Sequence, residues 1–230
     1  IFHYNLALSY CHLKNYYTAI DHIIFAKYYI PCDSYEDMKK ILLLEGVCNS
    51  EIKNYDGALR IYHKLLEILE KDSSIEDICL TYLNILQIYI DINNKSKAAQ
   101  QYNILLKYVD CIDKNSRSLP KILYHLADYY LYVNDYMSFE KTLNNALSLA
   151  KEHKNNVMVT QILLKIIDLF VKNEQYEKLI FLLENYENEI HHIILNENNK
   201  VVLKTIYNLL EYDCDYTKKL INKILVEKEG

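Results

Sequence analysis

Histidine and acidic side chains are the groups in this sequence that could catalyse a reaction or hold a metal, and their spacing favours neither role. His191 and His192 are adjacent, but neighbouring residues of a helix point about 100° apart and cannot readily share a metal ion. His125 and Asp128 could form an acid–base pair, but no nucleophile motif or phosphate-binding loop accompanies them. We therefore expect no enzyme activity, no metal site and no cofactor.

The cysteines are scattered along the chain and form no C-x-x-C pair. A chain of 230 residues is too long to need disulfides for stability. Cysteine is among the most buried residue types, so we expect small core side chains in a reducing cytoplasm, with a reactive or paired thiol as the alternative. The six positions are Cys11, Cys32, Cys48, Cys79, Cys111 and Cys214.

The charge balance limits the possible partners. The formal net charge is −5, so the chain lacks the basic surface expected of a domain that grips DNA or an anionic membrane. No stretch without a formally charged side chain is longer than residues 78–90, which is shorter than the ~20 apolar residues of a membrane-spanning helix. Contact with DNA is therefore expected only through a domain outside this chain, and no membrane contact is expected.

The elements that position these side chains should all be helices. The sequence has 3 Gly and 2 Pro, with 51% hydrophobic residues, whereas average usage would supply roughly 16 Gly and 11 Pro. A sheet-rich fold needs more turn residues than that. The sequence therefore predicts an all-α fold.

A repeat of about forty residues organises the chain into helical hairpins. The expected starts of the second helices are spaced by 39, 41, 40, 40 and 40 residues. We expect one domain over residues 1–230, with hairpin units at about 1–33, 34–73, 74–114, 115–154, 155–195 and 196–230. The second-helix starts are Tyr16, Tyr55, Ser96, Tyr136, Tyr176 and Tyr216.

Each first helix carries a buried stripe that ends at an aromatic residue. Apolar residues stand seven, four and three positions before Tyr89, Tyr130 and Phe170, and four and three positions before Tyr10, with Asn49 in the corresponding place of the second unit. The small residue Gly46 would let neighbouring helices approach closely. Polar residues at 33–36 and 73–76, and Ser118 before Pro120, predict helix N-caps.

These stripes resemble the tetratricopeptide repeat. The resemblance implies a right-handed superhelical solenoid of about six hairpins, with a period of about 40 residues in place of the usual 34. It is carried by Leu6, Ala7, Tyr10, Ala19, Ile23, Ala26 and Pro31 in the first unit, and by Leu126, Ala127, Tyr130, Phe139, Leu143 and Ala146 in the fourth.

A concave groove is expected on the first-helix face opposite the core. Positions five and two before the aromatic, and two after it, lie about half a turn from the core stripe. Asn and Gln there offer a donor and an acceptor to the main chain of an extended peptide, although a plain solvated face is the alternative. Leu8, Leu44 and Val47 would make the front of this groove apolar. The candidate peptide-binding residues are Asn5, Asn84, Gln87, His125, Asp128, Lys165, Asp168 and Asn208.

The unit length, the number of repeats and the Asn-, Ile-, Lys- and Tyr-rich composition are similar to the receptor domain of RRNPP regulators from Gram-positive bacteria. That resemblance implies a cytoplasmic quorum-sensing transcription regulator, a homodimer that binds a short signalling peptide. DNA would be bound by a separate helix-turn-helix domain, expected before residue 1. The alternatives are a generic protein–protein scaffold and a Rap-like protein that binds a response regulator. Chaperone adaptors of this repeat class bind a terminal carboxylate with Lys and Asn on the first repeat, where this sequence has Tyr4 and Leu8. We therefore do not expect a chaperone adaptor.

Overall fold

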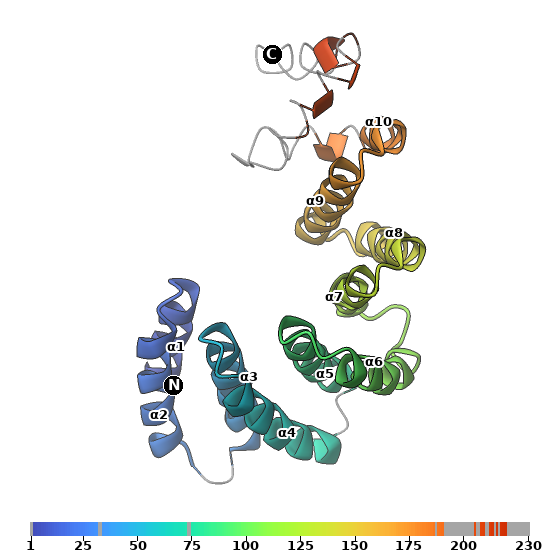
Figure 1. The fold of residues 1–230 in the computed structure, drawn as a ribbon. Coiled ribbons are helices and arrows are strands. Elements are labelled where there is room, and N and C mark those ends of the chain that lie inside the picture. The colour runs from blue at the N-terminus through green and yellow to red at the C-terminus, as the bar shows by residue number, and fades with distance from the viewer. Residues whose placement is uncertain are drawn as a thin grey trace. The chain divides into compact units, whose positions relative to one another are not determined.

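The computed structural model describes residues 2–31, 34–72, 75–186 and 188–190, with single residues and short pieces between 205 and 219. No strand occurs within this described part. Ten α-helices with defined bounds follow one another (Figure 1). They are α1 (Phe2–His12), α2 (Tyr16–Tyr29), α3 (Tyr35–Glu51), α4 (Tyr55–Asp72), α5 (Ile75–Asp91), α6 (Lys95–Val109), α7 (Leu119–Tyr132), α8 (Tyr136–Glu152), α9 (Asn156–Lys172) and α10 (Tyr176–Asn185).

The helices pack as consecutive hairpins within two compact units, Ile1–Asp135 and Tyr136–Gly230. In the first unit α1 packs on α2, α3 on α4 and α5 on α6, while α2 contacts α3, α4 contacts α5, and α7 contacts α5 and α6. In the second unit α8 and α10 both pack on α9. The all-α hairpin fold is therefore confirmed. The expected sixth unit, residues 196–230 with its second helix starting at Tyr216, lies mostly outside the described residues.

The second helices begin where the repeat predicts. Four of them start at Tyr16, Tyr55, Tyr136 and Tyr176, and α6 starts at Lys95, one residue before the expected Ser96. The expected core stripes are also buried or half-buried in every described unit. In the second unit of the repeat, for example, Ala58, Tyr62 and Leu65 belong to one buried cluster with Leu42 of α3 and Ile85 of α5.

Each hairpin turn is closed by main-chain hydrogen bonds around a residue in the left-handed region. At the end of α3 the Lys53 N–H donates to the Ser50 carbonyl and the Asn54 N–H to the Asn49 carbonyl, both at 2.9 Å. This pair of bonds is the Schellman arrangement that ends many helices. The same geometry recurs at Lys14, Asn93, Asn134, Lys154 and Glu174, and the φ angles of all six residues lie between 54° and 62°.

Asparagines cap the helices that follow four of these turns. The side chains of Asn15, Asn54, Asn94 and Asn155 each accept a hydrogen bond from the main-chain N–H three residues further along, at 3.4, 3.3, 3.1 and 3.1 Å. The caps expected from serine are positioned correctly but bond differently. Ser34 precedes α3 but donates its hydroxyl to the Asp37 carboxylate at 2.8 Å, and Ser118 precedes α7 without a side-chain cap bond. Residues 73 and 74 lie outside the described part.

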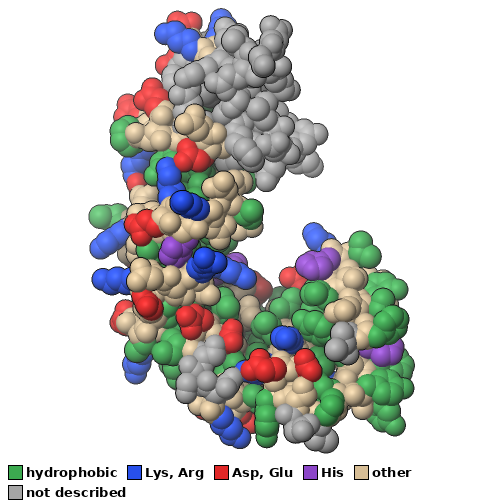
Figure 2. Space-filling view, turned by 180° about the vertical axis from the view of Figure 1, so that it is seen from behind, with side chains coloured by type: hydrophobic (Ala, Val, Ile, Leu, Met, Phe, Trp, Pro, Cys, Tyr) green, Lys and Arg blue, Asp and Glu red, His purple; other side chains and the backbone are tan. Residues whose placement is uncertain are grey.

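Aromatic rings hold the first hairpin together. The His3 ring stacks on Phe25 and Tyr29, and its Nδ1 lies 3.1 Å from Nδ1 of His22, which in turn stacks on Tyr10. Hydrophobic side chains also gather on the outer surface of α1 and α2 (Figure 2). The exposed members include Phe2, Tyr17, Ile24, Phe25, Tyr28 and Tyr29.

Candidate binding groove

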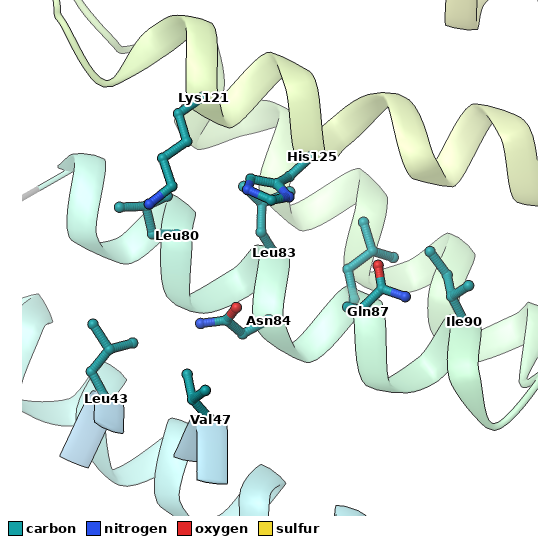
Figure 3. A pocket seen from close by; sticks show the side chains of 10 residues that line it. Leu43, Val47, Leu80, Leu83, Asn84, Gln87, Ile90, Lys121 and His125 are labelled. Carbon is teal, nitrogen blue, oxygen red and sulfur yellow. The ribbon is translucent and has the colours of Figure 1, made fainter. Parts of the chain in front are cut away.

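A pocket of about 320 Å³ lies among α3, α5 and α7, and all its residues belong to the first compact unit. Figure 3 shows aliphatic side chains of α3 and α5 facing the amides of α5, with a lysine and a histidine of α7 above them. The lining residues are Leu43, Val47, Leu80, Leu83, Asn84, Leu86, Gln87, Ile90, Lys121 and His125.

A second hollow of about 280 Å³ continues the pocket toward the C-terminal ends of α3 and α5. The two hollows share Val47, Asn84 and Gln87, so together they form one groove along α5, called the α5 groove below. The second hollow adds Ser50, Glu51, Lys53, Tyr55, Tyr62 and Asp91.

Two amides stand in the middle of the α5 groove. Asn84 is half-buried, and its side chain makes no hydrogen bond to any described residue. Gln87 donates from Nε2 to the Asp91 carboxylate at 2.8 Å, which leaves its carbonyl oxygen as an acceptor toward the groove. An amide that is half-buried without a partner is best satisfied by a ligand with its own donor and acceptor.

The charged groups of the α5 groove differ in their surroundings. Lys121 has no carboxylate within ion-pair distance among the described residues. At the other end, desolvation and the neighbouring Glu51 carboxylate both raise the pKa of Tyr16. Burial, reinforced by Cys48 and Glu51, also raises the pKa of Tyr62, which therefore stays neutral in the groove.

The structure brings together three of the residues predicted from sequence. Asn84, Gln87 and His125 line the α5 groove, while Asp128 is half-buried on α7 and does not line it. Asn5 is exposed on α1, also outside the groove. A peptide-binding role for any of these five residues stays a prediction.

The remaining predicted residues belong to the second unit. Lys165 and Asp168 are half-buried on α9. The Asp168 carboxylate forms an ion pair with the Lys172 ammonium at 2.6 Å. Asn208 is half-buried, and His191 and His192 lie outside the described residues. A hollow of about 540 Å³ among α8, α9 and α10 contains none of the predicted residues. Both of its lysines are already paired, Lys178 with Glu140 and Lys151 with Glu189, each at 2.8 Å.

One predicted groove residue is buried instead. Leu44 is 7% exposed and packs with Ala7, Ala19 and Ile23 in the core between the first two hairpins. Leu43 lines the groove in its place. Leu44 was assigned to the groove because it stands five positions before Asn49. Asn49 replaces the aromatic residue of the repeat and bonds to the Glu45 carbonyl and to Asn54. Counting from it did not identify the groove-facing residue at this turn of α3.

One helical turn of the groove, which carries Leu80 and Lys121, was not predicted from the sequence. Leu80 and Lys121 stand nine positions before Tyr89 and Tyr130, which is one helical turn before Asn84 and His125. Extending the rows by four residues toward the helix starts would have included both. Leu83 and Ile90 flank the predicted rows by a single residue.

The described residues contain neither a candidate metal cluster nor a candidate membrane span. No group of three or more His, Cys, Asp and Glu side chains lies close enough there to hold a metal ion. No helix in this part has the length and apolar character to cross a membrane.

No protein-family model matches the sequence, and no curated protein matches it. Solved structures match the fold. A Rap protein complexed with Competence and Sporulation Factor superposes with a TM-score of 0.71 at 16% identity, over 99% of this chain and 64% of that one. The hairpin array has the fold of the Rap proteins.

Two further structures agree with this likeness. The apo form of RapI gives a TM-score of 0.57 at 16% identity, over 96% of this chain and 84% of that one. BtubC (BKLC) from P. vanneervenii gives 0.63 at 14% identity, over 84% and 80%. The chain spans about two thirds of the length of the complexed Rap protein. The predicted resemblance to a tetratricopeptide-like helical fold is thereby confirmed.

Proposed function

We propose that this chain is the peptide-binding domain of a sensor protein and that a short, extended peptide binds in the α5 groove. The observation that carries this proposal is the unpartnered amide of Asn84 in an otherwise largely apolar pocket. An Asn side chain can donate to a peptide carbonyl and accept from a peptide N–H at once. The aliphatic wall formed by Leu43, Val47 and Leu80 would bury the ligand's apolar side chains.

The fold likeness supports the same function. A Rap protein with this fold was crystallised in complex with Competence and Sporulation Factor. We extend the proposal to a cytoplasmic regulator that acts as a homodimer and reaches DNA through a separate helix-turn-helix domain. The peptide would act by binding one conformation of the regulator better than another, since a ligand shifts an equilibrium only by its differential affinity.

A second candidate is a Rap-like protein that binds a response regulator. The match to two Rap structures, each over at least 96% of this chain, favours it. Both candidates use a peptide in the groove, so the first experiment is common to them.

Peptide binding is tested with the 230-residue chain and fluorescein-labelled pools of synthetic peptides five to eight residues long. We expect binding in fluorescence anisotropy, and a loss of about tenfold in affinity for Asn84→Ala, because one buried hydrogen-bonding group is left unpaired. The control is Asn103→Ala, which removes an exposed Asn of α6. Absence of binding to every pool, or equal binding by Asn84→Ala with an intact helical circular dichroism spectrum, would refute the proposal.

A further inference from the structure

The charges of the α5 groove are separated along its length. Lys121 of α7 and Leu80 of α5 both line the end of the groove nearest the start of α5 (Figure 3). Glu51 and Asp91 lie at the opposite end, where α3 and α5 finish. Leu80 and Asp91 are eleven residues apart on α5, so the two ends are separated by about 16 Å along the helix axis.

The two ends carry opposite formal charge. The residues lining the first hollow include the ammonium of Lys121 and no carboxylate, which makes that end formally cationic. The second hollow contains two carboxylates, Glu51 and Asp91, and one ammonium, Lys53, so its charge is −1. The Gln87 side chain donates to Asp91 and thereby holds that carboxylate beside the groove.

The middle of the groove is apolar apart from its two amides. Val47, Leu83 and Leu86 line it beside Asn84 and Gln87. A bound chain therefore meets a cation, an aliphatic wall with amides, and then two carboxylates. Complementary charges of this kind set the orientation and selectivity of a ligand more than its total affinity.

We propose, resting on the proposed function, that the α5 groove selects its peptide by charge order. A carboxylate of the peptide lies at Lys121, apolar side chains cover the aliphatic wall, and a cationic group lies between Glu51 and Asp91. The carboxylate can be the chain terminus or an acidic side chain, and the cation can be the amino terminus or a basic side chain. An extended chain covers the 16 Å separation with about five residues.

Three synthetic hexapeptides with acetylated and amidated ends test this order. The four central residues, which are apolar residues and serine, are the same in all three peptides. The two end residues are one basic and one acidic, both acidic, or both basic. We expect the basic–acidic peptide to bind the 230-residue chain about fivefold more tightly than either of the others, as for partly exposed ion pairs.

Variants of the two ends should change different preferences. In Lys121→Met, the basic–acidic peptide should no longer bind more tightly than the basic–basic peptide. It should still bind more tightly than the acidic–acidic peptide. Glu51→Gln combined with Asp91→Asn should do the reverse. The matched controls are Lys64→Met and Glu67→Gln, which alter exposed residues of α4 outside the groove. A peptide with neutral side chains and free ends, compared with its capped form, distinguishes terminal charges from side-chain charges.

The outcomes separate this inference from the proposed function. If all three peptides bind equally and Asn84→Ala weakens them equally, the charge order is refuted and the peptide-binding function stands. If no peptide binds, both are refuted. Equal effects of the groove variants and their controls would also refute the charge order, with circular dichroism used to show that every variant is folded.

Discussion

The ring of Tyr62 lies directly over the Cα of Gly46, where α4 packs on α3. A Cβ atom added at Gly46 would lie 2.7 Å from Cζ of Tyr62, far inside contact distance. Tyr62 is 1% exposed and is held by its neighbours in the buried cluster, so the ring has little room to move away. This close approach is what requires glycine at position 46, as the sequence pattern predicted.

Gly46→Ala should therefore lower the free energy of unfolding by about 1–3 kcal/mol, because the overpacking outweighs the helix propensity gained. Urea denaturation monitored by circular dichroism measures the change. In a Tyr62→Leu background the same substitution should instead be neutral or stabilising by up to about 1 kcal/mol. A stabilising effect in the wild-type background would contradict this packing.

Lys14→Gly should stabilise the protein modestly. Lys14 has a φ of 58°, and a residue with a Cβ pays about 1–2 kcal/mol there, part of which is offset by the greater freedom of glycine in the unfolded chain. We expect a gain of about 0.5 kcal/mol in urea denaturation. The control Lys64→Gly, inside α4, should cost about 1 kcal/mol. Equal losses for both would show that the turn is not strained.

Cys48 and Cys79 should resist alkylation in the folded protein. Burial raises the pKa of each thiol to about 12, with Cys11 contributing at Cys48 and Glu76 at Cys79. The thiolate is the reactive form, so raising the pKa lowers the reactive fraction at pH 8. Iodoacetamide and peptide mass spectrometry should show exposed Cys111 labelled first, and the two buried thiols labelled only in denaturant. Labelling of all three at one rate would contradict their burial.

Tyr130→Phe should destabilise the contact between α6 and α7 by about 1 kcal/mol. The Tyr102 and Tyr130 hydroxyls lie 2.6 Å apart, and the Tyr102 ring stacks on Tyr129 with centroids 4.1 Å apart. Removal of one hydroxyl leaves the other without its partner. Thermal unfolding measures the loss, and Tyr17→Phe, which changes an exposed ring, should leave the midpoint unchanged. A similar midpoint for both variants would argue against this bond.

The hairpins could be predicted from sequence because each unit has to bury one face of two helices. Where the repeat has its aromatic residue, as at Tyr89, counting from it identified groove residues correctly. In α3, where Asn49 replaces the aromatic residue, the same counting assigned the buried Leu44 to the groove. The Asn caps were missed because the expectation relied on serine and proline. Hydrogen bonds made by Ser34 and Asn15 depend on local geometry that residue type alone does not determine.

The groove could be predicted only in part for a related reason. Helical periodicity indicates the direction in which a side chain points, so Asn84, Gln87 and His125 were found. It does not indicate how far along the helix neighbouring helices stay in contact. Lys121 and Leu80 belong to the turn where α5 and α7 still face each other, and only the packed structure shows it.

Tyr62 belongs to the buried cluster and also lines the second hollow of the α5 groove. A substitution at this position changes hairpin packing and the ligand-facing surface in the same step. Ser50, Glu51 and Asp91 line the same end of the groove, but their side chains do not belong to that cluster. Substitutions at these three positions can therefore change ligand preference with the least effect on hairpin packing. Proteins with this array could acquire new ligands there while Tyr62 and Gly46 stay paired.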